Sequence, residues 1–247
     1  IDPYSMSEMN QTAGGEAFRS GYVSIVGRPN AGKSTLLNAL IGQKLAIVAD
    51  KPQTTRTSIQ GILHLPQAQV VFIDTPGIHK SDTLFNKRMM DTVRAALEER
   101  DLILYLADVT LPFGEADKQA LDAARKSGTP VILLLNKMDR LDRKDALLPV
   151  MAQYAEVMEF AEVMPISALT GEGLETLREA IVKRLPEGPA LYPEDQVTDQ
   201  PERFLAAELI RESVLESTSQ EVPHSVAVMI EQWEAKPKLT RITATIY

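Results

Sequence analysis

The chain has 247 residues, of which 44% are hydrophobic and 24% charged, and its formal net charge is −8. This length and composition predict a globular protein with one large domain and a smaller one, and exclude a fibrous or mostly disordered chain. The absence of cysteine excludes a disulfide framework and a thiolate metal site. An acidic chain has no general attraction to phosphate backbones, so nucleic-acid binding would need a local basic patch.

The N-terminal region has no apolar secretory segment, and Ile1–Ser5 precede the first methionine, Met6. We therefore expect residues 1–20 to be an added tag and a flexible N-terminus. The longest apolar run, Leu102–Ala107, is far shorter than the about 20 residues that a membrane-spanning helix needs. These features predict a cytoplasmic protein.

From residue 21 to residue 185, short apolar runs rich in β-branched residues alternate with stretches of helical periodicity. This alternation predicts an α/β domain whose mostly parallel six-stranded sheet is covered by helices on both faces. The expected strands are Tyr22–Val26, Gly61–Leu65, Val70–Asp74, Leu102–Asp108, Val131–Asn136 and Val163–Ser167. The expected helices are Ser34–Ile41, Leu84–Glu99, Glu115–Lys126, Asp142–Glu156 and Leu174–Arg184. Ligands of such folds bind at the carboxyl ends of the strands.

Residues 186–201 are rich in proline and acids and predict a linker. In residues 202–247, Ala206, Ile210 and Val214 recur at helical spacing, and two alternating apolar stretches that follow predict strands. One helix and two strands bury little core. We therefore expect an incomplete α+β domain that continues in the natural protein or leans on the first domain.

Residues 27–34 match the phosphate-binding P-loop pattern and lie between a predicted strand and a predicted helix, the context that this pattern requires. Backbone N–H groups of such a loop face phosphate oxygens, Lys33 reaches the outer phosphates, and Ser34 would ligate magnesium. An ordinary strand-to-helix turn is the alternative. The nucleotide-binding residues predicted here are Gly27, Arg28, Pro29, Asn30, Ala31, Gly32, Lys33, Ser34 and Thr35.

A second nucleotide-binding group, Asp74, Thr75, Pro76, Gly77 and Ile78, follows the third predicted strand. The Asp74 carboxylate can hold a magnesium-bound water, and the Gly77 N–H can meet a γ-phosphate. Such a sequence alone is a common turn, but its position after the P-loop indicates a switch segment. Because Ile78 stands where Ras-like GTPases have the glutamine that orients water, we expect slow unaided hydrolysis.

Asn136-Lys137-Met138-Asp139 follows the apolar run 131–135 and resembles the guanine-selecting motif of translation-factor GTPases. The resemblance implies that Asp139 accepts hydrogen bonds from two guanine nitrogens, which adenine cannot supply. It also implies that Asn136 and Lys137 brace the base and the P-loop. Ser167-Ala168, with Leu169, resembles the loop that meets the guanine oxygen, although a bare Ser-Ala pair is usually structural.

Pro52-Gln53-Thr54-Thr55-Arg56 lies where GTPases of this class keep switch I. The resemblance implies that Thr55 closes over magnesium beside Ser34 and Asp74; Thr54 or a merely solvated loop are the alternatives. Asn30 resembles the asparagine of potassium-stimulated GTPases, which implies K+ near the developing charge, and the alternative is that it only supports the turn. The residues expected to act in hydrolysis are Lys33, Thr55, Gly77 and Asn30.

The full set of motifs, together with the stretches Tyr192–Asp195 and Glu208–Glu212, resembles the Era family of bacterial GTPases across nearly the whole chain. The resemblance implies a magnesium-dependent GTPase that binds GTP and GDP and carries a C-terminal KH domain. It further implies binding to 16S ribosomal RNA in assembly of the small (30S) subunit, peripheral association with the inner membrane face, and a monomer. The alternatives are a nucleotide-gated RNA-binding module with little turnover and a different P-loop NTPase.

The region after Pro201 departs from the KH pattern. A KH domain clamps RNA with a Gly-x-x-Gly loop, which is absent after Gly188. Acidic residues also outnumber basic ones from Glu202 onward. We therefore expect this chain to have lost most of the family's RNA affinity.

Overall fold

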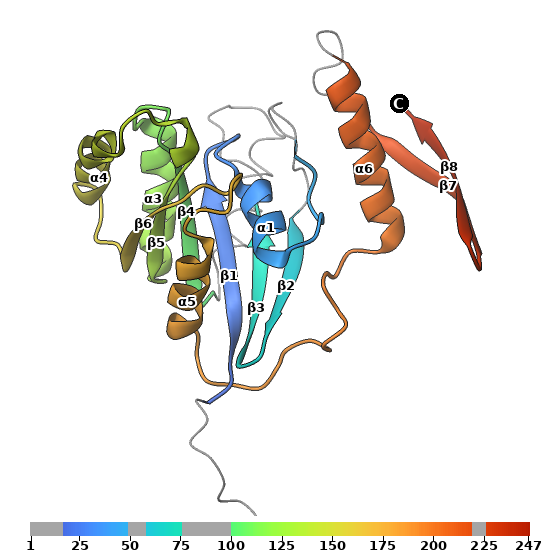
Figure 1. Ribbon diagram of the computed structural model, residues 1–247, viewed down its shortest axis with the longest axis horizontal. Helices are drawn as coiled ribbons and strands as arrows, with labels where there is room; N and C mark the ends of the chain where they lie inside the picture. The colour runs from blue at the N-terminus through green and yellow to red at the C-terminus, as the bar shows by residue number, and fades with distance from the viewer. Residues whose placement is uncertain (1–16, 49–57, 76–99, 219–225) are drawn as a thin grey trace, which may run out of the picture.

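The computed structural model describes residues 17–48, 58–75, 100–218 and 226–247. Its large sheet has six strands in the order β2-β3-β1-β4-β5-β6 (Figure 1). The strands are β1 (Arg19–Gly27), β2 (Ile59–Leu65), β3 (Ala68–Asp74), β4 (Leu102–Asp108), β5 (Val131–Asn136) and β6 (Glu162–Pro165). Only the β2–β3 pair is antiparallel among these strands. The predicted α/β fold with a mostly parallel sheet is confirmed.

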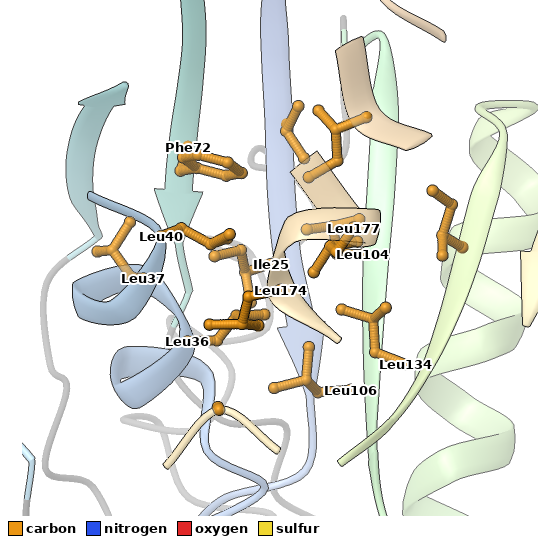
Figure 2. Close-up of a cluster of buried hydrophobic side chains, with 14 of the residues drawn as sticks. Ile25, Leu36, Leu37, Leu40, Phe72, Leu104, Leu106, Leu134, Leu174 and Leu177 are labelled. Atoms are coloured by element: carbon orange, nitrogen blue, oxygen red, sulfur yellow. The ribbon is translucent and has the colours of Figure 1, made fainter. Parts of the chain in front are cut away.

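Helices cover both faces of this sheet. The helices are α1 (Lys33–Ile41), α3 (Glu115–Ser127), α4 (Leu147–Ala155) and α5 (Leu174–Arg184). One apolar cluster joins α1 and α5 to the sheet, and a second joins α3 and α4 to the opposite face. Figure 2 shows the first cluster, in which Leu36 and Leu174 from the two helices meet Ile25 and Leu104 from the strands.

The central strands are apolar without alternation because both of their faces are covered. Every residue of β4 and of β5 is buried, including Asp108 and Asn136 at their ends. Burial of one leucine side chain contributes about 2 kcal/mol, so these strands dominate the stability of the domain. They also bring two polar residues, which the register pairs with each other, to the carboxyl edge of the sheet.

Several predicted elements match the structure apart from small shifts at their ends, while three differ more or lie outside the described residues. The predicted helix Asp142–Glu156 divides into a single 3-10 turn, Lys144–Ala146, followed by α4, which begins at Leu147. The last strand of the sheet ends at Pro165, one residue before the Ile166 N–H makes a final bond to the Leu135 carbonyl at 2.9 Å, so Ser167 lies in the loop beyond it. The predicted helix Leu84–Glu99 lies outside the described residues, as does most of the expected N-terminal tag.

Residues 186–201 contain no helix; they first bond to the start of β1 and then follow the outer edge of β2. The Ile62 N–H donates to the Val197 carbonyl at 2.9 Å, and the Thr198 hydroxyl donates to the Gln60 carbonyl at 2.6 Å. The buried Gln69 side chain accepts the backbone N–H groups of Leu191 and Tyr192. The segment is therefore fastened to the sheet along its length.

The C-terminal part consists of α6 (Glu202–Ser217) and a hairpin of β7 (Val228–Lys236) and β8 (Leu239–Ile246), at the orange and red end of Figure 1. The face of Ala206, Ile210 and Val214 that predicted the helix is half-buried. The most buried residues of α6 are instead Arg211, Glu212 and Leu215. None of the helices in the described ranges has the length and apolar character needed to cross a bilayer.

The buried face of α6 contacts the segment that follows α1. The Glu212 carboxylate accepts the Val48 N–H at 2.8 Å and pairs with Lys44 at 2.5 Å. Ile47 and Leu215 share a small apolar cluster with residues of the hairpin end. The α6 helix is thus joined to the chain shortly before the predicted switch I.

Candidate nucleotide-binding site

The predicted P-loop connects β1 to α1 at the carboxyl edge of the sheet. Gly32 has φ 99°, and a Cβ atom there would lie 2.4 Å from the Asn136 amide nitrogen, so only glycine fits. Asn30 is exposed and has φ 59°, a left-handed conformation that asparagine tolerates better than most residues. The loop therefore passes directly beneath the end of β5 before α1 begins at Lys33, and its backbone N–H groups lie at the positive end of the helix dipole.

Lys33 is buried at the beginning of α1. Its ammonium group donates to the Gly27 carbonyl at 3.2 Å and to the Arg28 carbonyl at 2.9 Å. Burial lowers the pKa of Lys33 to about 8, and the nearby Asp74 carboxylate acts in the opposite direction. Among the described residues this buried cation makes two hydrogen bonds, both to neutral carbonyl groups, so it gains strongly from an added anion, which a nucleotide phosphate would supply.

Asp74 lies at the end of β3, next to Lys33 and Ser34. Its Oδ2 accepts the Ser34 hydroxyl at 2.7 Å, whereas its Oδ1 is buried and has no hydrogen-bond partner among the residues that the structure describes. Burial raises the pKa of Asp74 to about 6, although Lys33 and Ser34 oppose this shift. A hard divalent cation prefers carboxylate and hydroxyl oxygens of this kind. The predicted magnesium ligands Ser34 and Asp74 therefore lie together and fit the ion.

Asn136 joins the P-loop to the loop after β6. Its amide nitrogen donates to the Ala31 carbonyl at 2.7 Å, and its amide oxygen accepts the Ala168 N–H at 2.9 Å. The side chain is almost fully buried. Asn136 therefore sets the distance between the predicted phosphate-binding and base-binding parts, which are far apart in the sequence.

Asp139 and Ser167 also lie together, as the motif spacing predicts. The Ser167 hydroxyl is buried and donates to Asp139 Oδ1 at 2.5 Å, which orients a carboxylate that is itself exposed. Asp139 belongs to the 3-10 turn Met138–Arg140, which follows Lys137 in the left-handed conformation. Leu169 is 73% exposed and makes no part of this buried bracing.

Asp108 is a site residue that the sequence analysis missed. It ends β4 and pairs with Lys137 at 2.6 Å, and it also accepts the N–H and hydroxyl groups of Thr110. Burial alone would raise the pKa of Asp108, but the hydrogen bonds from Lys137 and Thr110 hold it below its usual value. The available signal was positional, since Asp108 ends an apolar strand just as Asp74 and Asn136 do.

Several of the remaining predicted residues lie in ranges that the structure does not describe. Thr55 and its alternative Thr54 lie outside the described residues, as do Pro76, Gly77 and Ile78. Thr75 is described: its hydroxyl donates to the Ile25 carbonyl at 2.9 Å and so ties the end of β3 to β1. The roles assigned to these residues toward a nucleotide stay predictions.

Comparison with known proteins agrees with the motifs. The family described as 50S ribosome-binding GTPase matches residues 22–137. GTPase Era of Geobacter metallireducens is 48% identical over 231 residues, which span 93% of this chain and 77% of the relative. The chain belongs to the Era family of GTPases.

Solved Era structures share the fold over both parts of the chain. Era in complex with MgGDPNP and nucleotides 1506–1542 of 16S ribosomal RNA is 39% identical, with a TM-score of 0.88, over 93% of this chain and 78% of that one. A variant of Aquifex aeolicus Era bound to GDP and AlF4− is 38% identical, with a TM-score of 0.87, over 93% and 79%. The resemblance to Era expected from the sequence is confirmed.

Proposed function

We propose that this chain binds GTP and GDP together with Mg2+, hydrolyses GTP, and uses this cycle in assembly of the small ribosomal subunit through 16S ribosomal RNA. The observation that carries the proposal is the position of Asn136, which joins the P-loop at Ala31 to the base-binding loop at Ala168. This connection supports the proposal, because it would hold phosphate recognition and guanine recognition in one rigid frame. The Era complexes with MgGDPNP and with GDP and AlF4− support it.

The chain's own residues divide the task. Lys33 supplies a buried positive charge for the outer phosphates, and the N–H groups at the start of α1 face the same point. Asp139, held by Ser167, accepts hydrogen bonds from guanine. Ser34 and Asp74 would hold Mg2+, which neutralises phosphate charge as it develops during hydrolysis.

Nucleotide selectivity tests the site itself. Titration calorimetry with magnesium should show tight GDP binding and no ATP binding. Lys33→Ala should abolish GDP binding, because the buried cation is removed. Asp139→Asn should lower the affinity for GDP at least about tenfold and raise the affinity for xanthosine diphosphate. Guanine donates from an amine at the position where xanthine has a carbonyl, and that carbonyl can accept from the NH2 group of the new asparagine.

The matched control for the selectivity experiment is Asp145→Asn, which removes the charge of an exposed aspartate paired only with exposed Arg143. This variant should bind GDP as the unaltered chain does. Equal binding of ATP, or indifference to Asp139→Asn, would return the chain to the broader P-loop NTPase class.

Slow turnover and potassium stimulation are part of the proposal. Ile78 cannot orient water as a glutamine would, so unaided hydrolysis is slow. Phosphate release should rise when KCl replaces NaCl at equal ionic strength, and Asn30→Ala should abolish that rise. If the two salts give equal rates, Asn30 serves only the left-handed turn in which it lies.

The ribosomal RNA partner rests on the Era complex with nucleotides 1506–1542 of 16S ribosomal RNA. Because this chain lacks a Gly-x-x-Gly loop after Gly188, an RNA of that sequence should bind the GTP-loaded chain only weakly, but more tightly than a scrambled RNA of equal length in a filter-binding or anisotropy assay. Equal affinity for both RNAs would contradict the RNA part of the proposal. We place the protein in the cytoplasm, and its peripheral membrane association can be measured by co-sedimentation with anionic vesicles.

A further inference from the structure

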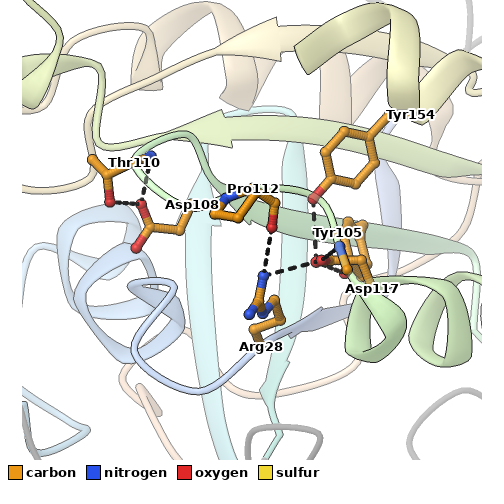
Figure 3. A network of polar contacts seen from close by, with 8 residues as sticks. Arg28, Tyr105, Asp108, Thr110, Pro112, Asp117 and Tyr154 are labelled. Carbon is orange, nitrogen blue, oxygen red and sulfur yellow. Dashed lines mark hydrogen bonds and ion pairs between the residues drawn. The ribbon is translucent and has the colours of Figure 1, made fainter.

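A buried carboxylate lies between the P-loop and helix α3, outside the residues so far assigned to the site. Asp117, in the first turn of α3, has no exposed surface. Figure 3 shows that Arg28, Tyr105 and Tyr154 all point toward it, from the P-loop, β4 and α4 respectively. Four elements of the domain therefore meet at one negative charge, counting α3 itself.

Three of the groups that donate to Asp117 are neutral. The hydroxyl groups of Tyr105 and Tyr154 donate to Oδ1 at 2.8 and 3.2 Å, and the Gly114 N–H donates to Oδ2 at 2.9 Å. Burial, together with the Asp117 charge, raises the pKa of both tyrosines, so they remain donors throughout the physiological range. The Gly114 contact caps α3 at its N-terminus. These bonds fix Asp117 independently of the P-loop.

The fourth donor is the side chain of Arg28, the second residue of the P-loop. Its Nη1 donates to Asp117 Oδ2 at 3.2 Å and to the Pro112 carbonyl at 3.0 Å. The carboxylate is buried and the guanidinium is 27% exposed, so this pair is screened less than a surface ion pair. The contact ties the loop to a part of the protein that α3 and two tyrosines hold rigid.

The backbone of Arg28 serves the lysine of the same loop. Its carbonyl accepts the Lys33 ammonium at 2.9 Å and the Ala31 N–H at 3.3 Å. A displacement of Arg28 would therefore displace an acceptor of the catalytic lysine and one turn of the loop. Arg28 therefore contacts both residues: its side chain donates to Asp117, and its carbonyl accepts from Lys33.

The two halves of the P-loop are tethered separately. Asn136 holds the second half at the Ala31 carbonyl, and Asp74 holds Ser34 at the start of α1. The first half, Gly27–Pro29, is held through its side chains by Arg28 alone among the described contacts. Loss of the Asp117 contact should therefore loosen Arg28 and Pro29, whereas Gly27 stays in its ladder with β4 and the second half stays in place.

We propose that Asp117 is a positioning residue of the GTPase site, which holds Arg28 and thereby sets the first half of the P-loop for hydrolysis. The inference rests on the proposed GTPase function, and it adds a residue from α3 that no nucleotide motif contains. Asp117 touches neither nucleotide nor metal and acts only through Arg28. Its loss should lower kcat more than it weakens GDP binding, because the groups that anchor the second half of the loop remain.

The test compares Arg28→Ala, Asp117→Asn and the double variant with the unaltered chain. In Asp117→Asn the amide keeps the shape of the carboxylate but has a single acceptor oxygen. When that oxygen accepts the tyrosine hydroxyls, the NH2 group replaces Oδ2 and can accept neither the Gly114 N–H nor Arg28, and the charge that holds Arg28 is lost. We expect kcat to fall about tenfold in each single variant, with KM and GDP affinity changed by about twofold or less. The double variant should lose no more than the worse single variant, because both changes break one contact.

The control is Asp122→Asn, on the same helix, which removes an exposed carboxylate paired with Arg125. It should leave kcat unchanged. Losses that multiply in the double variant, or equal losses in kcat and in GDP affinity, would overturn the inference. Because the Arg28 side chain is partly exposed, Arg28→Ala decides the question even if Asp117→Asn does not fold.

Hydrogen exchange separates this inference from the proposed function. In the nucleotide-free protein, the backbone amide of residue 28 and that of Ala31, which donates to the residue 28 carbonyl, should exchange faster in Arg28→Ala and Asp117→Asn, and at the unaltered rate in Asp122→Asn. Unchanged exchange in the first two variants overturns the positioning role, whatever the turnover. Absence of GTP hydrolysis by the unaltered chain would overturn the proposed function, while faster exchange would still establish the tether.

Discussion

The strands of the large sheet and those of the C-terminal hairpin are held by different forces. All seven residues of β4 are buried, whereas no residue of β8 is fully buried. β4 therefore depends on apolar contact with helices on both faces, and β8 depends on its backbone ladder with β7. The difference teaches that similar strand lengths carry very different shares of the folding free energy.

The largest expected effect is a loss of stability when a buried side chain of the large sheet is truncated. Leu104→Ala removes a fully buried side chain between α1, α5 and β1, and should lower the free energy of unfolding by about 3 kcal/mol. Leu239→Ala, at a residue 67% exposed on β8, should change it by less than about 0.5 kcal/mol. Denaturant unfolding followed by circular dichroism measures both. Equal losses would show that the hairpin contributes core burial that its exposure does not reveal.

The next effect concerns the polar side chains buried at the edge of the sheet. Asn136→Ala leaves the Ala31 carbonyl and the Ala168 N–H unpaired, which should cost about 2 kcal/mol of stability. It should also weaken GDP binding at least about tenfold, since it separates the two halves of the site. Chemical denaturation and titration calorimetry give the two quantities.

Asn38→Ala is the matched control for the Asn136 experiment. Its amide also makes several backbone bonds, to Leu45 and Ala46, but away from the nucleotide site. It should lower stability and leave GDP affinity unchanged. A loss of GDP affinity in Asn38→Ala would mean that stability, and not the bridge at Asn136, sets the affinity.

The apolar strands and the nucleotide motifs were predictable because each leaves a local signal. Uninterrupted burial makes β4 and β5 continuous apolar runs, and the P-loop must contain Gly32 and Lys33 at fixed spacing. By contrast, the partners of Asp108 and Asp117 are created by the fold and are invisible in the sequence. Asp117 lies 89 residues from Arg28, in a helix that carries no nucleotide motif.

The face of α6 was the least predictable part. Its apolar spacing predicted a buried face of Ala206, Ile210 and Val214. The most buried residues, however, include two charged ones, Arg211 and Glu212. Polar residues can be buried there because each has a partner: Arg211 pairs with Glu208, and Glu212 pairs with the segment after α1. A hydrophobic pattern reports only the apolar half of such an interface.

The smallest expected effect is a local opening where α6 contacts the segment that follows α1. Glu212→Ala removes the acceptor of the Val48 N–H and the partner of Lys44, which should favour local opening by about 1.4 kcal/mol. Hydrogen exchange at the Val48 amide should then become about tenfold faster.

Glu216→Gln, one helical turn further along α6 at an exposed position, is the control for Glu212 and should leave that exchange rate unchanged. If Glu212→Ala also leaves it unchanged, the apolar contact of Ile47 with Leu215 holds the boundary without the carboxylate.

The segment between the two regions has a consequence for how the protein behaves in a crowded solution. β2 is the last strand on its side of the sheet, and its outer backbone groups would otherwise be unpaired. Val197 and Thr198 bond to Ile62 and Gln60 along that edge, so they take the place of a further strand. An unpaired edge is a template on which another chain can add its own strand. By covering it, residues that make no regular structure of their own protect the β2 edge of the sheet from strand addition by another chain.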